Sequence, residues 1–317
     1  MKPLILVMDV LRERSPLLTQ HYQYLARKDG PLEIKFCNSL NIPIDQAVWE
    51  TCGDRKPDYI YWGFTHGKAL RLNRDYIINN NIKIITEIGD VSSWGQCSGN
   101  FSQLKVDIIV FRAPSLDYLG ERERLWISKC ECFKDADIVP VPWGIDTKKY
   151  KLGRQIMRNH DIAFLCTIGS EFKYHDERRQ ISKILGKMKR QYKFPITKGR
   201  IFGDAYIKTL CNTKLFIVEP SMRDWLTQKY LEGAMCGCLM VGKIPTMARN
   251  VFKDGENFIE IDDWEELPGK IRSALNFPGN VHKMARVGRS VVYERFSIEK
   301  TAGILEERIL EDFNCQT

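Results

Sequence analysis

The segment PSMRDWLTQKYLEGAMCGCLMVGKI, residues 220–244, is the most informative part of the chain. Asp224 and Glu232 are separated by seven residues, so a helix here would place them about two turns apart on nearly one face. Lys229 would lie close to Glu232 on the same helix. The following GCLMVGKI predicts a short buried strand bounded by glycines. A helix that leads directly into such a strand is typical of a parallel α/β sheet.

The same alternation runs along the rest of the chain, where short apolar runs alternate with longer amphipathic stretches. The first series of expected strands is LILVMDV, EIKFC, DYIYWGF, IKIITEI and VDIIVF. The second series is DIAFLCTIG, KGRIFG, KLFIVEP, GCLMVGK and NFIEI. Two such series indicate an α/β protein with two Rossmann-like domains, each built on a parallel sheet.

The boundary between the two series lies in ADIVPVPWGIDTKKYKLGRQIMRNHD, where two prolines and Gly144 interrupt regular structure and a polar, basic linker follows. We therefore expect one domain over residues 1–150 and a second over residues 151–317. The final stretch SIEKTAGILEERILEDF predicts a terminal helix with Ser297 as its N-cap, and we assign it to the second domain.

Composition narrows the class of protein. The apolar N-terminus MKPLILVMDV is too short for a secretory core or a membrane span, so we expect no transmembrane segment. Ten cysteines without repeated spacing indicate reduced, mostly buried thiols, which favours a cytoplasmic protein, or host cytoplasm if the source is viral. The two C-x-C pairs lack the further ligands of a zinc site, so we expect no metal centre.

The net charge of +8 is concentrated in one segment. Residues 1–150 hold 20 Lys and Arg against 19 Asp and Glu, whereas residues 173–208 hold 11 basic and 3 acidic residues. Such an excess attracts a nucleic acid or holds a diphosphate. A solvated helix face is the equally consistent alternative.

Several motifs resemble those of GT-B glycosyltransferases, which use nucleotide-sugar donors. VPVPWGIDTKKY resembles their interdomain segment, and IAFLCTIGSEFKYHDERRQISKIL resembles the first strand, phosphate loop and helix of their donor domain. DGENFIEIDDWEEL resembles a later turn, and residues 220–244 resemble the donor-site helix. The motifs cover most of residues 138–300 in the family's order, whereas residues 1–137 match only in general pattern. CgeB-like enzymes and, in spacing, phage DNA β-glucosyltransferases are the most similar subgroups. The resemblance implies two Rossmann-like domains with parallel sheets facing across a cleft.

The resemblance also implies how the diphosphate of the donor is held. Gly169 and Ser170 would form a tight loop, and a helix would begin near Asp176. Lys173 and Arg178 would then lie at or just inside the helix start and neutralise the phosphates. Ordinary helix surface is the alternative for both basic residues.

Three further residues match the donor-site helix of the family. Glu232 stands where the family's carboxylate accepts hydrogen bonds from the ribose, and Lys229 matches a position that is often basic and faces the phosphates. Asp224 stands where retaining members carry the first Glu of E-x7-E, so sugar contact and stereochemical outcome stay open. For Asp224, a helix N-cap is the alternative.

Asp90, in IKIITEIGDVSSWGQ, is the candidate catalytic base. It follows an apolar strand, and open α/β sheets bind ligands at the carboxyl ends of their strands. An inverting enzyme needs one carboxylate to take the acceptor's proton, and phage glucosyltransferases resemble this chain in having an Asp in a comparable loop. Glu87, Asp9 and His66 are the rivals, each with a loop or turn role as the alternative.

These observations predict a metal-independent glycosyltransferase, with hexosyl transfer favoured. No D-x-D element follows a strand as in metal-dependent sugar transferases, so basic side chains and helix ends would neutralise the leaving diphosphate. We expect no cofactor, only a UDP- or GDP-linked sugar as co-substrate. The acceptor would be a glycan, a lipid-linked sugar or a small molecule.

Two alternatives remain beside this prediction. The basic segment leaves nucleic acid open as a partner, as in a phage-type transferase that glycosylates a hydroxylated base, although residues 1–150 are nearly neutral in charge. A non-catalytic nucleotide-sugar-binding protein is the second alternative, because Asp224 replaces Glu and DVLRERSP lacks a glycine-rich first loop. A Rossmann dehydrogenase is disfavoured, since no G-x-G-x-x-G follows the first strand.

Overall fold

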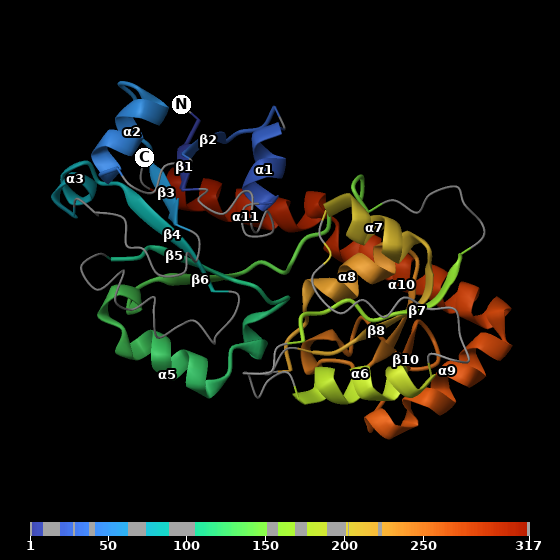
Figure 1. The fold of residues 1–317 in the computed structure, drawn as a ribbon. Helices are drawn as coiled ribbons and strands as arrows, with labels where there is room; N and C mark the ends of the chain where they lie inside the picture. The colour runs from blue at the N-terminus through green and yellow to red at the C-terminus, as the bar shows by residue number, and fades with distance from the viewer. Residues whose placement is uncertain are drawn as a thin grey trace. The chain divides into compact units, whose positions relative to one another are not determined.

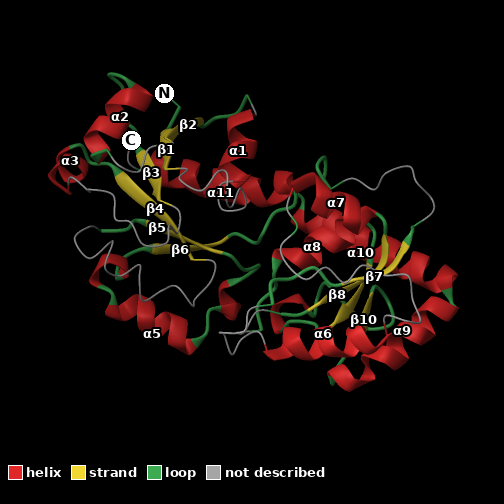
Figure 2. Cartoon of the chain, in the orientation of Figure 1, coloured by secondary structure: helices red, strands yellow, loops and turns green. Residues whose placement is uncertain are grey.

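A computed structural model of the chain divides into two compact units (Figure 1). Unit 1 comprises Met1–Gly144 and Ile298–Thr317, and unit 2 comprises Ile145–Ser297. The structure describes residues 2–8, 20–27, 29–37, 42–62, 74–88, 105–150, 158–168, 176–188, 201, 203–220 and 224–315. In each unit the strands gather in one sheet with helices around it (Figure 2).

Unit 1 contains a six-stranded sheet of order β2-β1-β3-β4-β5-β6 in which every neighbouring pair is parallel. Its strands are β1 (Leu4–Met8), β2 (Glu33–Cys37), β3 (Tyr59–Trp62), β4 (Lys83–Ile88), β5 (Ile108–Phe111) and β6 (Asp137–Pro140). Most of them are apolar throughout because both faces of the sheet are covered. All five strands expected in the first series are present.

The helices of unit 1 are α1 (Gln20–Arg27), α2 (Ile44–Cys52), α3 (Arg74–Asn79), α5 (Glu121–Lys129) and α11 (Ile298–Asn314). Helices α1 and α11 contact each other and share one core with the sheet. The fully buried members of that core include Ile5, Val7, Tyr22, Tyr59, Tyr61, Ile85, Val110, Ala302, Leu305 and Ile309.

The terminal helix α11 contacts unit 1, whereas the sequence analysis assigned it to the second domain. Tyr59 donates a hydrogen bond to Asp312 Oδ2 at 2.7 Å, and the ammonium of Lys83 pairs with the same carboxylate at 2.7 Å. Arg308 Nε donates to Asp137 Oδ2 at 2.7 Å. The apolar face of α11 covers the sheet of unit 1, so the chain returns to its first unit after residue 297.

Unit 2 contains a four-stranded parallel sheet of order β10-β9-β8-β7. Its strands are β7 (His160–Ala163), β8 (Thr213–Val218), β9 (Leu239–Gly242) and β10 (Phe258–Glu260). Residues 239–242 form the short buried strand expected in GCLMVGKI. The strand expected in KGRIFG falls largely outside the described residues, and a helix begins at Gly203 instead.

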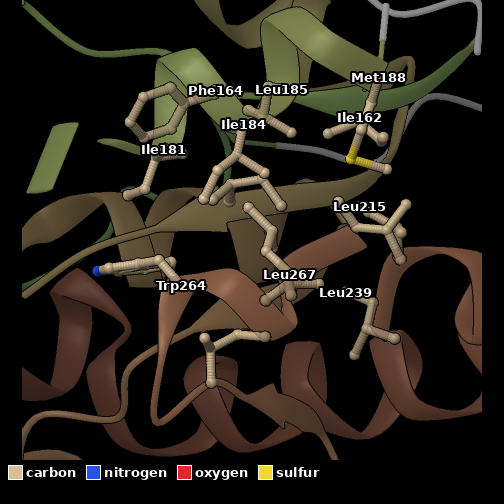
Figure 3. Close-up of a cluster of buried hydrophobic side chains, with 14 of the residues drawn as sticks. Ile162, Phe164, Ile181, Ile184, Leu185, Met188, Leu215, Leu239, Trp264 and Leu267 are labelled. Atoms are coloured by element: carbon tan, nitrogen blue, oxygen red, sulfur yellow. The ribbon is translucent and has the colours of Figure 1, made fainter. Parts of the chain in front are cut away.

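The helices of unit 2 are α6 (Asp176–Met188), α7 (Gly203–Cys211), α8 (Gln228–Met235), α9 (Leu267–Asn276) and α10 (Pro278–Phe296). Helices α6 and α9 pack on one face of the sheet through a cluster that includes Ile181, Ile184, Leu185, Leu215, Leu239, Trp264 and Leu267 (Figure 3). Helix α8 packs on the other face, where Gly233 lies against Phe216 and Met240. A Cβ at residue 233 would come within 2.5 Å of Phe216, so glycine permits this close packing.

The expected fold class is confirmed, because both units are α/β structures with parallel sheets. The described cysteines are free thiols, most of them buried. Within the described ranges, no helix has both the length and the apolar character needed to cross a lipid bilayer.

Candidate functional site

Half of the predicted site residues lie in the described part of unit 2, namely Arg178, Asp224, Lys229 and Glu232. The other half lie outside the described residues, namely Asp90, Gly169, Ser170 and Lys173.

Arg178 and Lys229 meet at one carboxylate, that of Glu219. Glu219 directly follows β8, at the carboxyl end of a parallel strand, where α/β sheets bind ligands. Its Oε1 accepts hydrogen bonds from Arg178 Nε at 2.7 Å and from Lys229 Nζ at 3.1 Å. Arg178 Nη1 also donates to the carbonyl oxygen of Thr167 at 3.1 Å. Two residues predicted to bind phosphate are therefore brought together, and we call Arg178, Glu219 and Lys229 the Glu219 cluster.

The Glu219 cluster is only partly closed to solvent. The side chain of Glu219 is 4% exposed, whereas those of Arg178 and Lys229 are each 23% exposed. Among the described residues, the buried Oε2 of Glu219 has no hydrogen-bond partner. The cations thus remain accessible to a ligand while their carboxylate partner is buried.

Both cations lie in the first turn of a helix. Helix α6 begins at Asp176 and α8 at Gln228, so Arg178 and Lys229 are close to backbone N–H groups that carry partial positive charge. Thr227 is the N-cap of α8 but makes no side-chain capping bond, and its buried Oγ1 has no partner in the described structure. An uncapped helix start beside two cations is a suitable environment for an anion.

Glu232 lies one turn after Lys229 on α8 and is buried. Its Oε1 accepts a hydrogen bond from the hydroxyl of Tyr150 and its Oε2 one from the hydroxyl of Tyr206, both at 2.8 Å. Burial raises the pKa of Glu232, and the hydrogen bonds from Tyr206 and Tyr150 together with the charge of Lys229 offset part of that rise. Both oxygens of this carboxylate accept from hydroxyl groups, the kind of donor that a ribose diol also presents.

Asp224 does not lie on the helix that the sequence analysis expected. It precedes α8 in a loop, with a left-handed φ of 58° that Asp tolerates better than most residues. Its Oδ2 accepts hydrogen bonds from the backbone N–H of Thr246, at 2.9 Å, and from the Thr246 hydroxyl. The expectation that Asp224 and Glu232 share a helix face is therefore wrong, because α8 begins only at Gln228. Asp224 is also not the N-cap of α8, which is Thr227.

Sequence reasoning missed three side chains of the site. Glu219 carried a signal, since it is an acidic residue at the end of the apolar run KLFIV. Tyr150 ends the motif GIDTKKY, but nothing in the sequence connects it with Glu232. Tyr206 lies within α7, and no sequence motif around it indicates a role in a site.

In unit 1, the rival base Glu87 is completely buried at the end of β4. Its Oε2 accepts hydrogen bonds from Arg112 Nη2 at 2.5 Å and from the Tyr61 hydroxyl at 2.7 Å. This carboxylate is therefore engaged in a fully buried ion pair and is closed to an acceptor molecule. The other candidates, Asp90, Asp9 and His66, lie outside the described residues.

Within the described ranges, no group of three or more His, Cys, Asp or Glu side chains is arranged to hold a metal ion. The two partly exposed cations of the Glu219 cluster are available to an anion.

Comparison with known proteins shows what unit 2 is similar to. Residues 155–307 match the model of a family described as glycosyl transferase-like. The match covers nearly all of unit 2, including the Glu219 cluster and Glu232. No curated protein matches the chain significantly in sequence.

Three solved structures share the fold but are distant in sequence. HepE from Anabaena in complex with UDP has 12% identity and a TM-score of 0.59, with 98% of this chain and 100% of that chain covered. Sucrose-phosphate synthase from Thermosynechococcus elongatus has 11% identity and a TM-score of 0.63, with 99% and 100% covered. An alpha-glucosyltransferase in complex with UDP-glucose and DNA containing an abasic site has 8% identity and a TM-score of 0.62, with 96% and 98% covered. The resemblance to GT-B glycosyltransferases is confirmed by this fold and by the family match.

Proposed function

We propose that this chain is a glycosyltransferase of the GT-B fold that transfers a hexose from a uridine diphosphate sugar to an acceptor hydroxyl. Two of its structural neighbours support the choice of donor: HepE was solved with UDP-glucose, and the alpha-glucosyltransferase was also solved with UDP-glucose. The sugar-transfer activity itself rests on the family match.

One observation carries the proposal: two cations meet at an uncapped helix start, one turn from a buried carboxylate. Arg178 and Lys229 would bind the diphosphate, the arginine through its remaining N–H groups and the lysine as a point charge. Glu232 would accept the ribose hydroxyls. Gly169, Ser170 and Lys173 would complete the phosphate loop.

The chemical step then needs a base and a stabilised leaving group. In an inverting reaction, the acceptor oxygen attacks the anomeric carbon and loses its proton to a carboxylate, while the sugar–phosphate bond breaks and the nucleoside diphosphate leaves. We assign Asp90 as that base. Asp90→Asn should abolish transfer and leave UDP affinity unchanged, whereas full activity of this variant would exclude Asp90.

Transfer should proceed without a divalent ion or a cofactor, because two cations and a helix start neutralise the leaving diphosphate. The measurement is turnover after exhaustive treatment with EDTA. Complete loss of turnover that magnesium or manganese restores would refute metal independence.

The donor is identified by screening UDP- and GDP-linked hexoses for thermal stabilisation, since a ligand bound only by the folded chain raises its melting temperature. Each ligand that stabilises the chain is then tested for hydrolysis and for transfer to glycan, lipid-linked and small-molecule acceptors. Binding without turnover on any acceptor would favour the non-catalytic alternative.

DNA is the second candidate acceptor, because one neighbour was solved with DNA. The concentrated positive charge of residues 173–208 supports it, and the near-neutral residues 1–150 count against it. Binding to duplex DNA that falls steeply with salt would favour this acceptor. Absence of binding at low salt would eliminate it.

A further inference from the structure

Glu219 has no part in the proposed donor contacts, yet it lies between the two residues that make them. It follows β8 directly, and its side chain is 4% exposed. Arg178 comes from α6 and Lys229 from α8, so Glu219 is the group that joins the two helix starts.

Stability alone does not account for a glutamate at this position. Oε1 accepts two hydrogen bonds, whereas the buried Oε2 has no partner among the described residues. Buried polar atoms are nearly always hydrogen-bonded, and an unpaired one is destabilising. Replacing a buried ion pair by neutral groups is often neutral or stabilising. Because its two cations are also each 23% exposed, the negative charge of Glu219 points to a function.

The two cations keep capacity for a second anion. A lysine ammonium has three N–H donors, and only one is used on Glu219. An arginine guanidinium has five, of which Nε donates to Glu219 and Nη1 to Thr167. A diphosphate can therefore bind to the remaining N–H groups while Glu219 stays in place, so that two anions share the same two positive charges.

We propose that Glu219 is a built-in counter-anion that competes with the donor diphosphate for Arg178 and Lys229. Without ligand, it holds both side chains in place and neutralises one of their two positive charges. With ligand, it weakens the hold on the diphosphate, so that the nucleoside diphosphate product leaves. Glu219 is thus a positioning residue that touches neither sugar nor acceptor, and this role rests on the proposed function.

The sign of a mutational effect separates this role from a merely structural one. If Glu219 only held the cations in place, its loss would weaken binding of the nucleoside diphosphate. If it competes with the ligand, loss of its charge strengthens binding, because two uncompensated cations then face the diphosphate. The near-isosteric Glu219→Gln keeps an acceptor oxygen and removes only the charge.

The experiment is calorimetric titration of UDP and GDP into the purified full chain, wild type and Glu219→Gln. Whichever nucleotide the wild type binds should bind the variant about tenfold more tightly, as expected when a like charge is removed close to the ligand. Unchanged or weaker binding by a folded variant would overturn the inference. In a Lys229→Ala background, the gain from Glu219→Gln should shrink, because the two residues act through one contact.

Glu260→Gln is the matched control, since Glu260 also ends a strand of this sheet but pairs with Arg249. It should leave nucleotide affinity unchanged, and a tenfold gain there would show a general charge effect and overturn the inference. If Glu219→Gln does not fold, Glu219→Met replaces it, because it also removes the charge at a similar side-chain length, and binding should again tighten. A wild type that binds neither UDP nor GDP would overturn the proposed function itself, a result distinct from the others.

Discussion

Each unit carries a carboxylate paired with an arginine at the carboxyl end of its parallel sheet. In one of these two pairs the cation side is exposed to solvent, and we call it the open pair; the other, fully buried pair is the closed pair. In unit 1, the side chains of Glu87 and Arg112 are both 0% exposed. In unit 2, Glu219 is 4% exposed, whereas Arg178 and Lys229 each keep 23%. Similar chemistry therefore occurs once in a closed and once in an accessible environment.

The closed pair, Glu87 and Arg112, is surrounded by side chains that contact it directly. Arg112 Nη1 contacts His21 Nδ1 at 3.1 Å, and its guanidinium lies 5.2 Å from the centre of the Trp143 ring. Burial lowers the pKa of His21, and the positive charge of Arg112 lowers it further, so the imidazole is neutral. Tyr61 donates to Glu87. Nothing in this arrangement leaves Arg112 accessible to a ligand.

The difference shows that solvent access, more than the identity of the charged groups, separates a structural ion pair from a binding site. A fully buried pair cannot exchange its partner without leaving an uncompensated charge in a low dielectric. A pair with exposed cations can exchange its partner, because water and ligand reach the cation side.

Arg112→Ala should give the largest effect, a loss of about 3 to 5 kcal/mol in unfolding free energy, because it leaves Glu87 buried without its cation. The measurement is urea unfolding of the full chain. Arg249→Ala is the control, since Arg249 is 59% exposed and pairs with Glu260, and its loss should be below about 1 kcal/mol. Equal losses in the two variants would remove the distinction between closed and open pairs.

Lys229→Ala should act on binding more than on stability. Loss of a charge-assisted hydrogen bond is expected to weaken nucleoside diphosphate affinity by about 1.5 to 3 kcal/mol. The measurement is calorimetric titration with UDP. Lys214→Ala is the control, because Lys214 pairs with Asp161 near the opposite end of β8 and should not affect affinity. Unchanged affinity in Lys229→Ala would place the phosphates elsewhere.

Gly242→Ala tests whether the close approach of β9 to β8, next to Glu219, is needed for stability and for binding. A Cβ at residue 242 would lie 1.9 Å from the carbonyl oxygen of Val218, the residue before Glu219, so the ends of β8 and β9 must move apart. We expect a loss of about 1 to 3 kcal/mol in unfolding free energy, together with weaker UDP binding. Gly269→Ala is the control, since nothing lies within 4 Å of its added Cβ. A fully stable Gly242→Ala would show that the strand ends are free to move.

The fold was largely predictable because local patterns determine it. Apolar runs such as LFIV predicted the strands, and the spacing of Ile181, Ile184 and Leu185 predicted the buried face of α6. The placement of α11 was not predictable from the local sequence pattern, because the hydrogen bond between Tyr59 and Asp312 joins residues 253 positions apart.

The site was predictable only in its separate residues. The sequence indicated Arg178, Lys229 and Glu232, but not that the first two meet at Glu219, 41 and 10 positions away. The start of α8 was also misplaced, because Asp224 adopts a left-handed conformation and bonds to Thr246. Such contacts depend on how strand ends and helix starts come together across the sheet, which local pattern does not encode.

The smallest effect is expected for Tyr206→Phe, which removes one of the two hydroxyl donors to Glu232. At neutral pH, UDP affinity should change by about threefold or less, the value of one neutral hydrogen bond, since the freed oxygen of Glu232 is then available to the ribose. At acidic pH, the UDP affinity of Tyr206→Phe should differ more from that of the wild type. The hydrogen bond from Tyr206 lowers the pKa of Glu232, which burial has raised, so its loss moves that pKa further up.

Because the ribose needs an ionised Glu232, UDP affinity should fall as the pH is lowered through the pKa of this residue, and in Tyr206→Phe the fall should begin at a higher pH. The measurement is UDP affinity as a function of pH in wild type and variant. Tyr230→Phe is the control, since the Tyr230 hydroxyl donates to the carbonyl oxygen of Lys243 and not to Glu232. Superimposable pH profiles for wild type and Tyr206→Phe would mean that Glu232 does not contact the nucleotide, which would leave the Glu219 cluster as the part of unit 2 that binds the donor.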